Sequence, residues 1–167
     1  MHFDRAFSPY AYEGVIKELV HQFKYKNKDY LDKALSAFMI NFIKEYNLPV
    51  DYIDYILPVP LHKNRLRERE FNQAELLGKR IAEEFNKKLA GETLLRHVNT
   101  KTQTELDMRE RMENVRGSFS VKDAALVKGK NLLLVDDVFT TGSTASECAL
   151  ALKNSGAGIV FVLTLAN

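Results

Sequence analysis

The sequence has few of the residues that mark secreted or membrane proteins. It contains a single cysteine, Cys148, so no internal disulfide can form, which suits a reducing compartment. It has no run of the roughly 18 apolar residues that a membrane-spanning helix needs, and its N-terminus lacks a signal-peptide pattern. We therefore expect a soluble, cytoplasmic protein that makes no contact with a membrane.

The sequence also lacks a strong excess of charge of either sign. Lys and Arg together number 24, Asp and Glu number 22, and the formal net charge is +2. Overall charge therefore gives no evidence of a bulk positive field for nucleic acid, although local basic clusters remain possible. A chain of 167 residues with 46% hydrophobic content is long enough for one α/β domain with a substantial core.

The spacing of apolar residues predicts alternating helices and strands. Helical spacing recurs over residues 16–23, 31–42 and 77–85, and Asn72 is a suitable N-cap for the third helix. Strands are predicted over residues 52–59, 93–96, 130–136 and 158–165, with another helix before the last strand. We therefore expect an α/β fold: an open, mostly parallel sheet flanked by helices, with ligand loops at the carboxyl ends of its strands.

The most informative stretch, residues 132–144, joins a buried strand to a hydroxyl-rich turn. Four consecutive aliphatic residues predict a strand that is covered on both faces, and Asp136 and Asp137 follow them directly. The turn then consists of Thr140, Thr141, Gly142, Ser143 and Thr144. The next apolar positions have helical spacing and include Cys148, whose thiol we expect in the core.

This combination of groups suits a ribose 5-phosphate. The N-terminus of a helix offers backbone N–H groups and a partial positive charge, and the hydroxyls of the turn add donors for a phosphate. Carboxylates accept hydrogen bonds from the vicinal hydroxyls of a ribose and can hold the waters of Mg²⁺. Alternatively, Asp136 and Asp137 simply end the strand, and Ser143 or Thr144 caps the helix. The complete pattern favours the ligand site.

A basic segment follows the strand at residues 52–59 and is predicted to be a loop at the same edge of the sheet. Residues 60–70 include four cationic side chains: Lys63, Arg65, Arg67 and Arg69. Guanidinium groups bind diphosphate oxygens in a bidentate manner, so a pyrophosphate site is one interpretation. A solvated charged surface is the other. For His62, a structural hydrogen bond is favoured over a role as general base.

The 132–144 stretch closely resembles the signature of type I phosphoribosyltransferases, which bind 5-phosphoribosyl-1-pyrophosphate (PRPP). Further segments resemble the competence protein F (ComF) family of phosphoribosyltransferase-like proteins: Leu57-Pro58-Val59-Pro60-Leu61-His62, Arg65-Leu66-Arg67-Glu68-Arg69 and Phe71-Asn72-Gln73-Ala74-Glu75. Together with Phe23-Lys24-Tyr25-Lys26, the resemblance covers nearly the whole chain. The four-cysteine zinc module that often begins such proteins is absent, and Glu70 occupies a position where Gly is expected.

The resemblance implies a type I phosphoribosyltransferase fold. It implies a single phosphoribosyltransferase-like domain over residues 1–167, with an N-terminal helical hood-like segment (1–48) and a core (49–167). Asp136 and Asp137 would be the catalytic carboxylates that meet the ribose hydroxyls. Mg²⁺ would be carried by PRPP and would reach these carboxylates through water, without direct ligation. The turn at residues 140–144 would bind the 5-phosphate.

Two further segments acquire roles through the resemblance. Pyrophosphate would be bound by Pro60, Leu61, His62 and Arg65. Residues 96–116 would form a mobile loop that closes over the site and brings in Arg109 and Arg111. The alternative for this segment is an ordinary exposed helix with Met108 and Met112 packed inward.

The implied reaction transfers the phosphoribosyl group of PRPP to a nitrogen nucleophile and releases pyrophosphate. The sequence does not identify the acceptor, and we expect any acceptor specificity to come from the N-terminal helices. Two other functions stay open. The chain could be a non-catalytic sensor of PRPP or a nucleotide, or an accessory factor in DNA uptake that contacts single-stranded DNA or a helicase.

Overall fold

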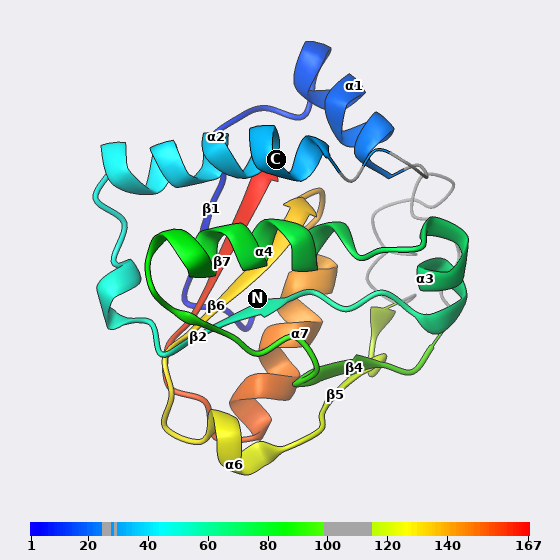
Figure 1. Cartoon of the computed structure of the whole chain (residues 1–167). Helices are drawn as coiled ribbons and strands as arrows, with labels where there is room; N and C mark the ends of the chain where they lie inside the picture. Colours follow the sequence, from blue (N-terminus) through cyan, green and yellow to red (C-terminus); the bar gives the residue numbers. More distant parts are fainter. Residues whose placement is uncertain (25–27, 29, 99–114) are drawn as a thin grey trace.

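A five-stranded parallel sheet forms the centre of the protein in the computed structural model (Figure 1). The structure describes residues 1–24, 28, 30–98 and 115–167. All neighbouring strands in this sheet run parallel. Their spatial order is β1 (Arg5–Phe7), β7 (Val160–Ala166), β6 (Leu132–Val138), β2 (Tyr55–Pro58) and β3 (Lys88–Leu89). A separate antiparallel pair consists of β4 (Leu94–Arg96) and β5 (Phe119–Val121). The predicted open, mostly parallel sheet is confirmed.

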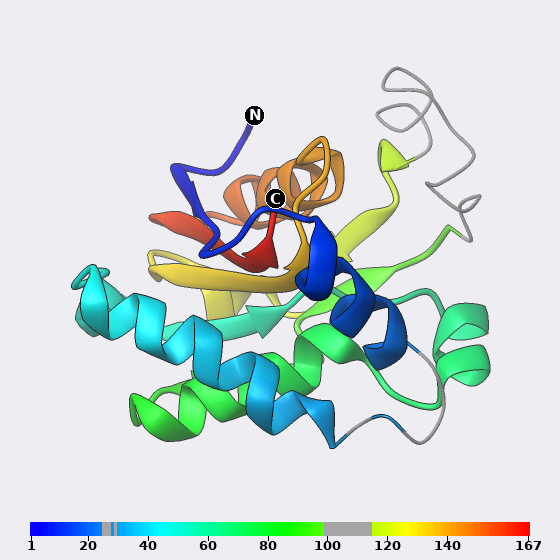
Figure 2. The ribbon, with the colours of Figure 1, turned by 90° about the horizontal axis from the view of Figure 1, so that it is seen from above.

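Helices cover both faces of this sheet (Figure 2). One face carries α2 (Leu31–Glu45) and α4 (Gln73–Glu84), and the other carries α7 (Ser143–Asn154). The helix α1 (Gly14–Phe23) lies near the carboxyl ends of β6 and β7. The remaining short helices are α3 (Lys63–Arg69), α6 (Ala124–Val127) and the 3₁₀-helix η1 (Val50–Tyr52). No helix in the described part of the chain is long and apolar enough to cross a membrane.

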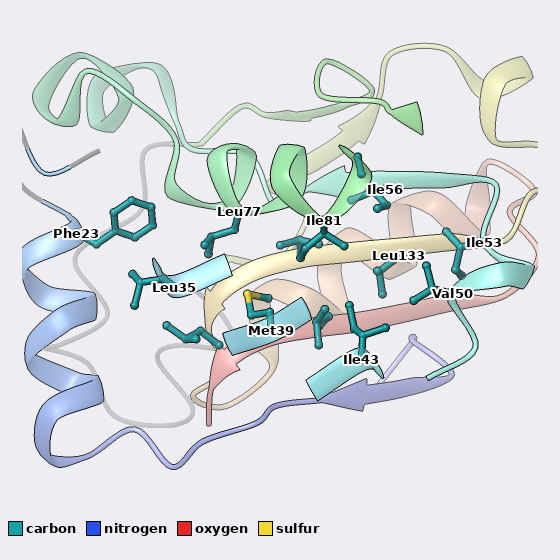
Figure 3. Close-up of a cluster of buried hydrophobic side chains, with 14 of the residues drawn as sticks. Phe23, Leu35, Met39, Ile43, Val50, Ile53, Ile56, Leu77, Ile81 and Leu133 are labelled. Carbon is teal, nitrogen blue, oxygen red and sulfur yellow. The ribbon is translucent and has the colours of Figure 1, made fainter. Parts of the chain in front are cut away.

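Burial of β6 on both faces explains its uninterrupted aliphatic sequence. Successive side chains of a strand point to opposite faces of the sheet. Leu133 and Val135 therefore join the hydrophobic cluster under α2 and α4, part of which Figure 3 shows. Leu132 and Leu134 join the second cluster, under α7, together with the fully buried Cys148. The predicted core position of Cys148 is thus confirmed.

The structure corrects several element boundaries. The strand predicted over residues 52–59 is limited to β2, because residues 50–52 form the 3₁₀-helix η1. The segment 60–70, predicted to be a loop, contains the helix α3, none of whose residues is buried. A strand in the first third of the chain was not predicted, yet β1 pairs with β7. The division of the chain at residue 48 stays a prediction.

Candidate functional site

The carboxyl ends of β2 and β6 bring the two predicted ligand segments to one edge of the sheet. Pro58 pairs in register with Val135, and the Val59 N–H donates to the Val135 carbonyl oxygen at 2.9 Å. Residues 60–62 therefore leave the sheet beside the Asp136–Asp137 pair. The turn at residues 140–144 begins just beyond the end of β6. The parallel sheet predicted from sequence had led us to expect these two segments at the same edge.

The two carboxylates differ in their surroundings because β6 continues through them to residue 138. Strand alternation places Asp136 on the α7 face, with Leu134, and Asp137 on the opposite face. Burial raises the pKa of Asp136 to about 7, and the negative charge of Asp137 adds to this shift. The Asp137 N–H donates to Asp136 Oδ1 at 2.9 Å. Asp136 is therefore close to half-ionised at neutral pH.

Asp137 forms an ion pair with Lys24, which directly follows helix α1. Lys24 Nζ lies 3.2 Å from Asp137 Oδ2, and the Asp137 side chain is only 13% exposed. A carboxylate buried to this degree is costly without a compensating charge, and Lys24 supplies that charge. The N-terminal segment thus contributes a cation directly to the carboxyl edge of the sheet.

Arg69 and Arg96 lie near the same carboxylates, and Arg65 lies near both of these arginines. Burial lowers the pKa of Arg69, and the charges of Asp137 and Asp136 oppose that shift. Burial likewise lowers the pKa of Arg96, with Asp136 again among the opposing charges and with Arg65 and Arg69 close enough to repel it. Arginine remains protonated in proteins, so these side chains and Lys24 gather several cations beside the two carboxylates and Glu68. Such a cluster of cations favours a polyanionic ligand.

The turn that begins α7 has the backbone conformation of an anion site. Gly142 adopts the left-handed conformation with φ of 71°, and a Cβ there would lie 2.5 Å from Cζ of the Phe139 ring. The side-chain hydroxyls of Thr141 and Ser143 share a hydrogen bond at 2.7 Å. The N-cap residue Gly142 has no side chain to cap α7, and the Ser143 N–H donates to the Thr141 hydroxyl at 3.4 Å. The partial positive charge of the α7 N-terminus therefore faces the turn.

The segment predicted to bind pyrophosphate begins with a structural histidine. His62 Nδ1 accepts a hydrogen bond from the Asn64 N–H at 3.2 Å and caps α3, in agreement with the structural role favoured from sequence. At the other end of α3, Glu70 has a φ of 70°, a left-handed conformation that usually favours glycine. The backbone here thus keeps the geometry expected of Gly despite the substitution.

The β4–β5 pair brings the two ends of the predicted mobile loop next to Asp136 and α7. The Arg96 guanidinium carbon lies 5.4 Å from the centre of the Phe119 ring, a cation–π contact. Glu147 of α7 accepts a hydrogen bond from the Gly117 N–H at 2.8 Å. Between these anchors, residues 99–114 lie outside the described residues. The predictions for Arg109, Arg111, Met108 and Met112 therefore stay predictions.

Sequence reasoning did not assign Lys24 or Arg96 to the ligand site. Arg69 belonged to the basic segment for which a pyrophosphate site was one interpretation, whereas Arg96 was recognised only as the start of the predicted mobile loop. For Lys24, the available signal was its place in the Phe23-Lys24-Tyr25-Lys26 segment that resembles the ComF family. Its contact with Asp137 spans more than 100 residues of sequence, and no local pattern predicts a contact of that kind.

The donor set suits a hydrated magnesium ion. Carboxylate oxygens accept hydrogen bonds from the waters that Mg²⁺ retains, and Asp136 and Asp137 present such oxygens at one edge. Within the described ranges, the structure has no cluster of three or more His, Cys, Asp and Glu side chains that could hold a metal ion. Mg²⁺ carried by a diphosphate and hydrogen-bonded through its waters fits these residues.

Comparison with curated proteins identifies the family. The chain is 31% identical over 156 residues to the DNA utilization protein YhgH of Escherichia coli K12, covering 92% of this chain and 68% of that protein. It is 30% identical over 158 residues to competence protein F of Haemophilus influenzae, covering 89% of this chain and 66% of that protein. The chain belongs to the ComF family. The ComFC protein of Bacillus subtilis is 30% identical over 150 residues. No protein-family model matches the chain.

Solved structures confirm the type I phosphoribosyltransferase fold of this ComF-family chain. Glutamine PRPP amidotransferase of B. subtilis superimposes with a TM-score of 0.54 and 19% identity, covering 83% of this chain and 26% of that enzyme. A structure described as the allosteric regulatory enzyme of purine biosynthesis gives a TM-score of 0.52 with 22% identity, again over 83% of this chain and 26% of the other. At these identities the similarity establishes the fold alone.

Proposed function

We propose that this ComF-family chain binds PRPP with Mg²⁺ at the carboxyl edge of its sheet and transfers the phosphoribosyl group to a nitrogen nucleophile. The observation that carries the proposal is the arrangement at this edge. Two carboxylates, the N-terminus of α7 and two arginines that interact with these carboxylates meet there. This set of groups matches a ligand with a phosphate, a diol and a diphosphate.

Each part of PRPP has a counterpart in the proposed complex. The 5-phosphate accepts hydrogen bonds from the first turn of α7 and from the hydroxyls of Thr141 and Ser143. The ribose hydroxyls donate to Asp136 and Asp137. The diphosphate lies toward residues 60–65, where Arg65 adds a bidentate donor. When bound, Mg²⁺ neutralises part of the diphosphate charge and so improves the leaving group.

In the proposed reaction, the bond between the anomeric carbon and the pyrophosphate oxygen breaks, and its electron pair leaves with pyrophosphate. The nitrogen nucleophile forms the new bond to the anomeric carbon, and its proton passes to solvent. Positive charge grows on the ribose during this exchange, and the carboxylates of Asp136 and Asp137 stabilise it. Burial of these groups strengthens the interaction because the surrounding dielectric constant is low.

Pyrophosphate release tests the catalytic part of this proposal. The chain is incubated with PRPP, Mg²⁺ and ammonia or a panel of nitrogen bases, and released pyrophosphate is measured. We expect acceptor-dependent release by the parent and loss of release in the Asp136→Asn/Asp137→Asn double variant. If PRPP binds but no acceptor in the panel promotes release, the chain is instead a sensor of PRPP.

A second candidate function rests on the names of the relatives, which refer to DNA utilization and competence. In that role the exposed cations of α3, Lys63 and Arg67, would contact the phosphates of single-stranded DNA. The affinity for DNA would then fall steeply as the salt concentration rises. Lys63→Ala/Arg67→Ala would remove about two phosphate contacts and would therefore make the slope of log affinity against log salt concentration less steep. Salt-independent or undetectable DNA binding would argue against this role.

A further inference from the structure

Gln73 is a buried polar side chain that links two cations of the candidate site. It is only 2% exposed at the start of α4. Its Oε1 accepts a hydrogen bond from Arg69 Nη1 at 3.0 Å, and its Nε2 donates to the Phe23 carbonyl oxygen at 3.2 Å. One amide thus fixes the guanidinium of Arg69 and the last residue of α1, which immediately precedes Lys24.

Packing of Phe23 at the end of α1 positions the next residue, Lys24, beside Asp137. Phe23 is fully buried, and its ring packs against Phe71 with 5.9 Å between ring centres. Figure 3 shows the Phe23 side chain within the core cluster beside Leu35 and Leu77. With its neighbour anchored by packing and by Gln73, Lys24 extends to Asp137 at 3.2 Å. Its side chain nevertheless stays 27% exposed, so a ligand can reach it.

Two cations meet at Asp137. Lys24 forms an ion pair with it, and Arg69 interacts with Asp137, Asp136 and Glu68. A diphosphate placed beside Lys24 and Arg69 would accept charge-assisted hydrogen bonds from both side chains. The ribose hydroxyls of the same ligand would donate to Asp137 and take the place of Lys24 there. When the ion pair opens, Lys24 would therefore face the negative charge of the diphosphate, and Asp137 would accept hydrogen bonds from the ribose hydroxyls.

We propose that Lys24 and Arg69, positioned by Gln73, bind the diphosphate of PRPP, and that the ion pair between Lys24 and Asp137 opens when this ligand binds. This inference rests on the proposed function, and it adds a diphosphate site supplied by the N-terminal segment. Lys24 is a binding residue in this account. Gln73 is a positioning residue, because it acts through Arg69 and the end of α1.

The test compares ligands with and without a diphosphate. Dissociation constants are measured by calorimetry for PRPP, for pyrophosphate and for ribose 5-phosphate, all with Mg²⁺. The variants are Lys24→Met and Lys24→Arg. Lys17→Met serves as a matched control, because Lys17 is exposed on the same helix. Gln73→Met removes both hydrogen bonds at similar volume.

We expect Lys24→Met to weaken PRPP and pyrophosphate binding about ten- to a hundredfold, the size of one charge-assisted hydrogen bond. Ribose 5-phosphate should bind as tightly as before or more tightly, because Asp137 is then free to accept its hydroxyls. Lys24→Arg should restore most of the PRPP affinity, and Lys17→Met should match the parent. Gln73→Met should weaken PRPP binding while sparing ribose 5-phosphate.

Equal losses for all three ligands in Lys24→Met would assign Lys24 a purely structural role and overturn the inference. Unchanged PRPP affinity would overturn it as well. A parent chain that binds pyrophosphate but not PRPP would refute the proposed function and leave the diphosphate site standing. A parent that binds neither would refute both.

Discussion

Replacing Asp136 with asparagine should make the protein more stable at and above neutral pH. The pKa of this half-buried carboxyl is raised from 3.8 to about 7, so ionisation costs free energy in the folded state that it does not cost in the unfolded chain. Asparagine keeps the shape and removes the charge. The gain in stability would come at the expense of ligand binding, which is typical of functional sites.

The sign and size of the stability change caused by Asp136→Asn follow from proton linkage. Between about pH 4 and pH 7 the folded state holds a proton on Asp136 that the unfolded state has lost, so stability falls as pH rises through this range. Three pKa units at about 1.36 kcal/mol each set an upper limit of about 4 kcal/mol. Because Asp136 is only partly buried from solvent, we expect a gain of roughly 1–3 kcal/mol for Asp136→Asn at pH 8.

Urea unfolding of parent and variant at pH 4, 5, 6, 7 and 8 measures this effect. The difference in unfolding free energy should be near zero at pH 4 and should grow to its full value above pH 7. Asp51→Asn, which removes an exposed carboxylate of η1, serves as the matched control for the loss of one carboxylate. A variant that is no more stable than the parent at pH 8 would refute the account of Asp136.

Two further substitutions, each with a matched control, test the backbone of the site. Gly142→Ala and Gly129→Ala both place a side chain at a positive φ, near 70°, which costs about 1–2 kcal/mol, but only at Gly142 would the new Cβ meet the Phe139 ring. Thermal unfolding should show a larger loss of stability for Gly142→Ala than for Gly129→Ala. In calorimetry, only Gly142→Ala should lose affinity for ribose 5-phosphate. Equal effects of the two substitutions would contradict the proposed role of this turn. Glu70→Gly should raise the unfolding free energy by about 0.5–1 kcal/mol by relieving a φ of 70°, whereas Asn86→Gly should change it less because Asn tolerates this conformation. A loss of stability in Glu70→Gly would show that contacts of the Glu70 side chain outweigh the backbone strain.

The sequence predicted the central layers well because their signals are local and strong. The unbroken aliphatic run before Asp136 identified β6, and Asn72 does cap α4, accepting a hydrogen bond from the Ala74 N–H at 3.1 Å. From these elements the position of the Asp136–Asp137 pair at the carboxyl edge followed directly. The family resemblance then supplied the roles.

Three features could not be read from local patterns. The strand β1 has only three residues and an exposed or half-buried sequence, so its pairing with β7 depends on tertiary contacts. The helix α3 buries none of its residues and therefore shows no apolar periodicity. The contact between Lys24 and Asp137 joins segments that are distant in sequence. Each of these is set by the folded arrangement and not by local propensity.

Calorimetric titration of the purified chain with PRPP, with and without Mg²⁺, tests the central claim most directly. Ribose 5-phosphate and inorganic phosphate serve as controls for the separate parts of the ligand. The account predicts Mg²⁺-dependent binding of PRPP that is tighter than the binding of either control. Failure to bind PRPP, or binding no tighter than that of phosphate alone, would contradict the assignment of this edge as a phosphoribosyl site.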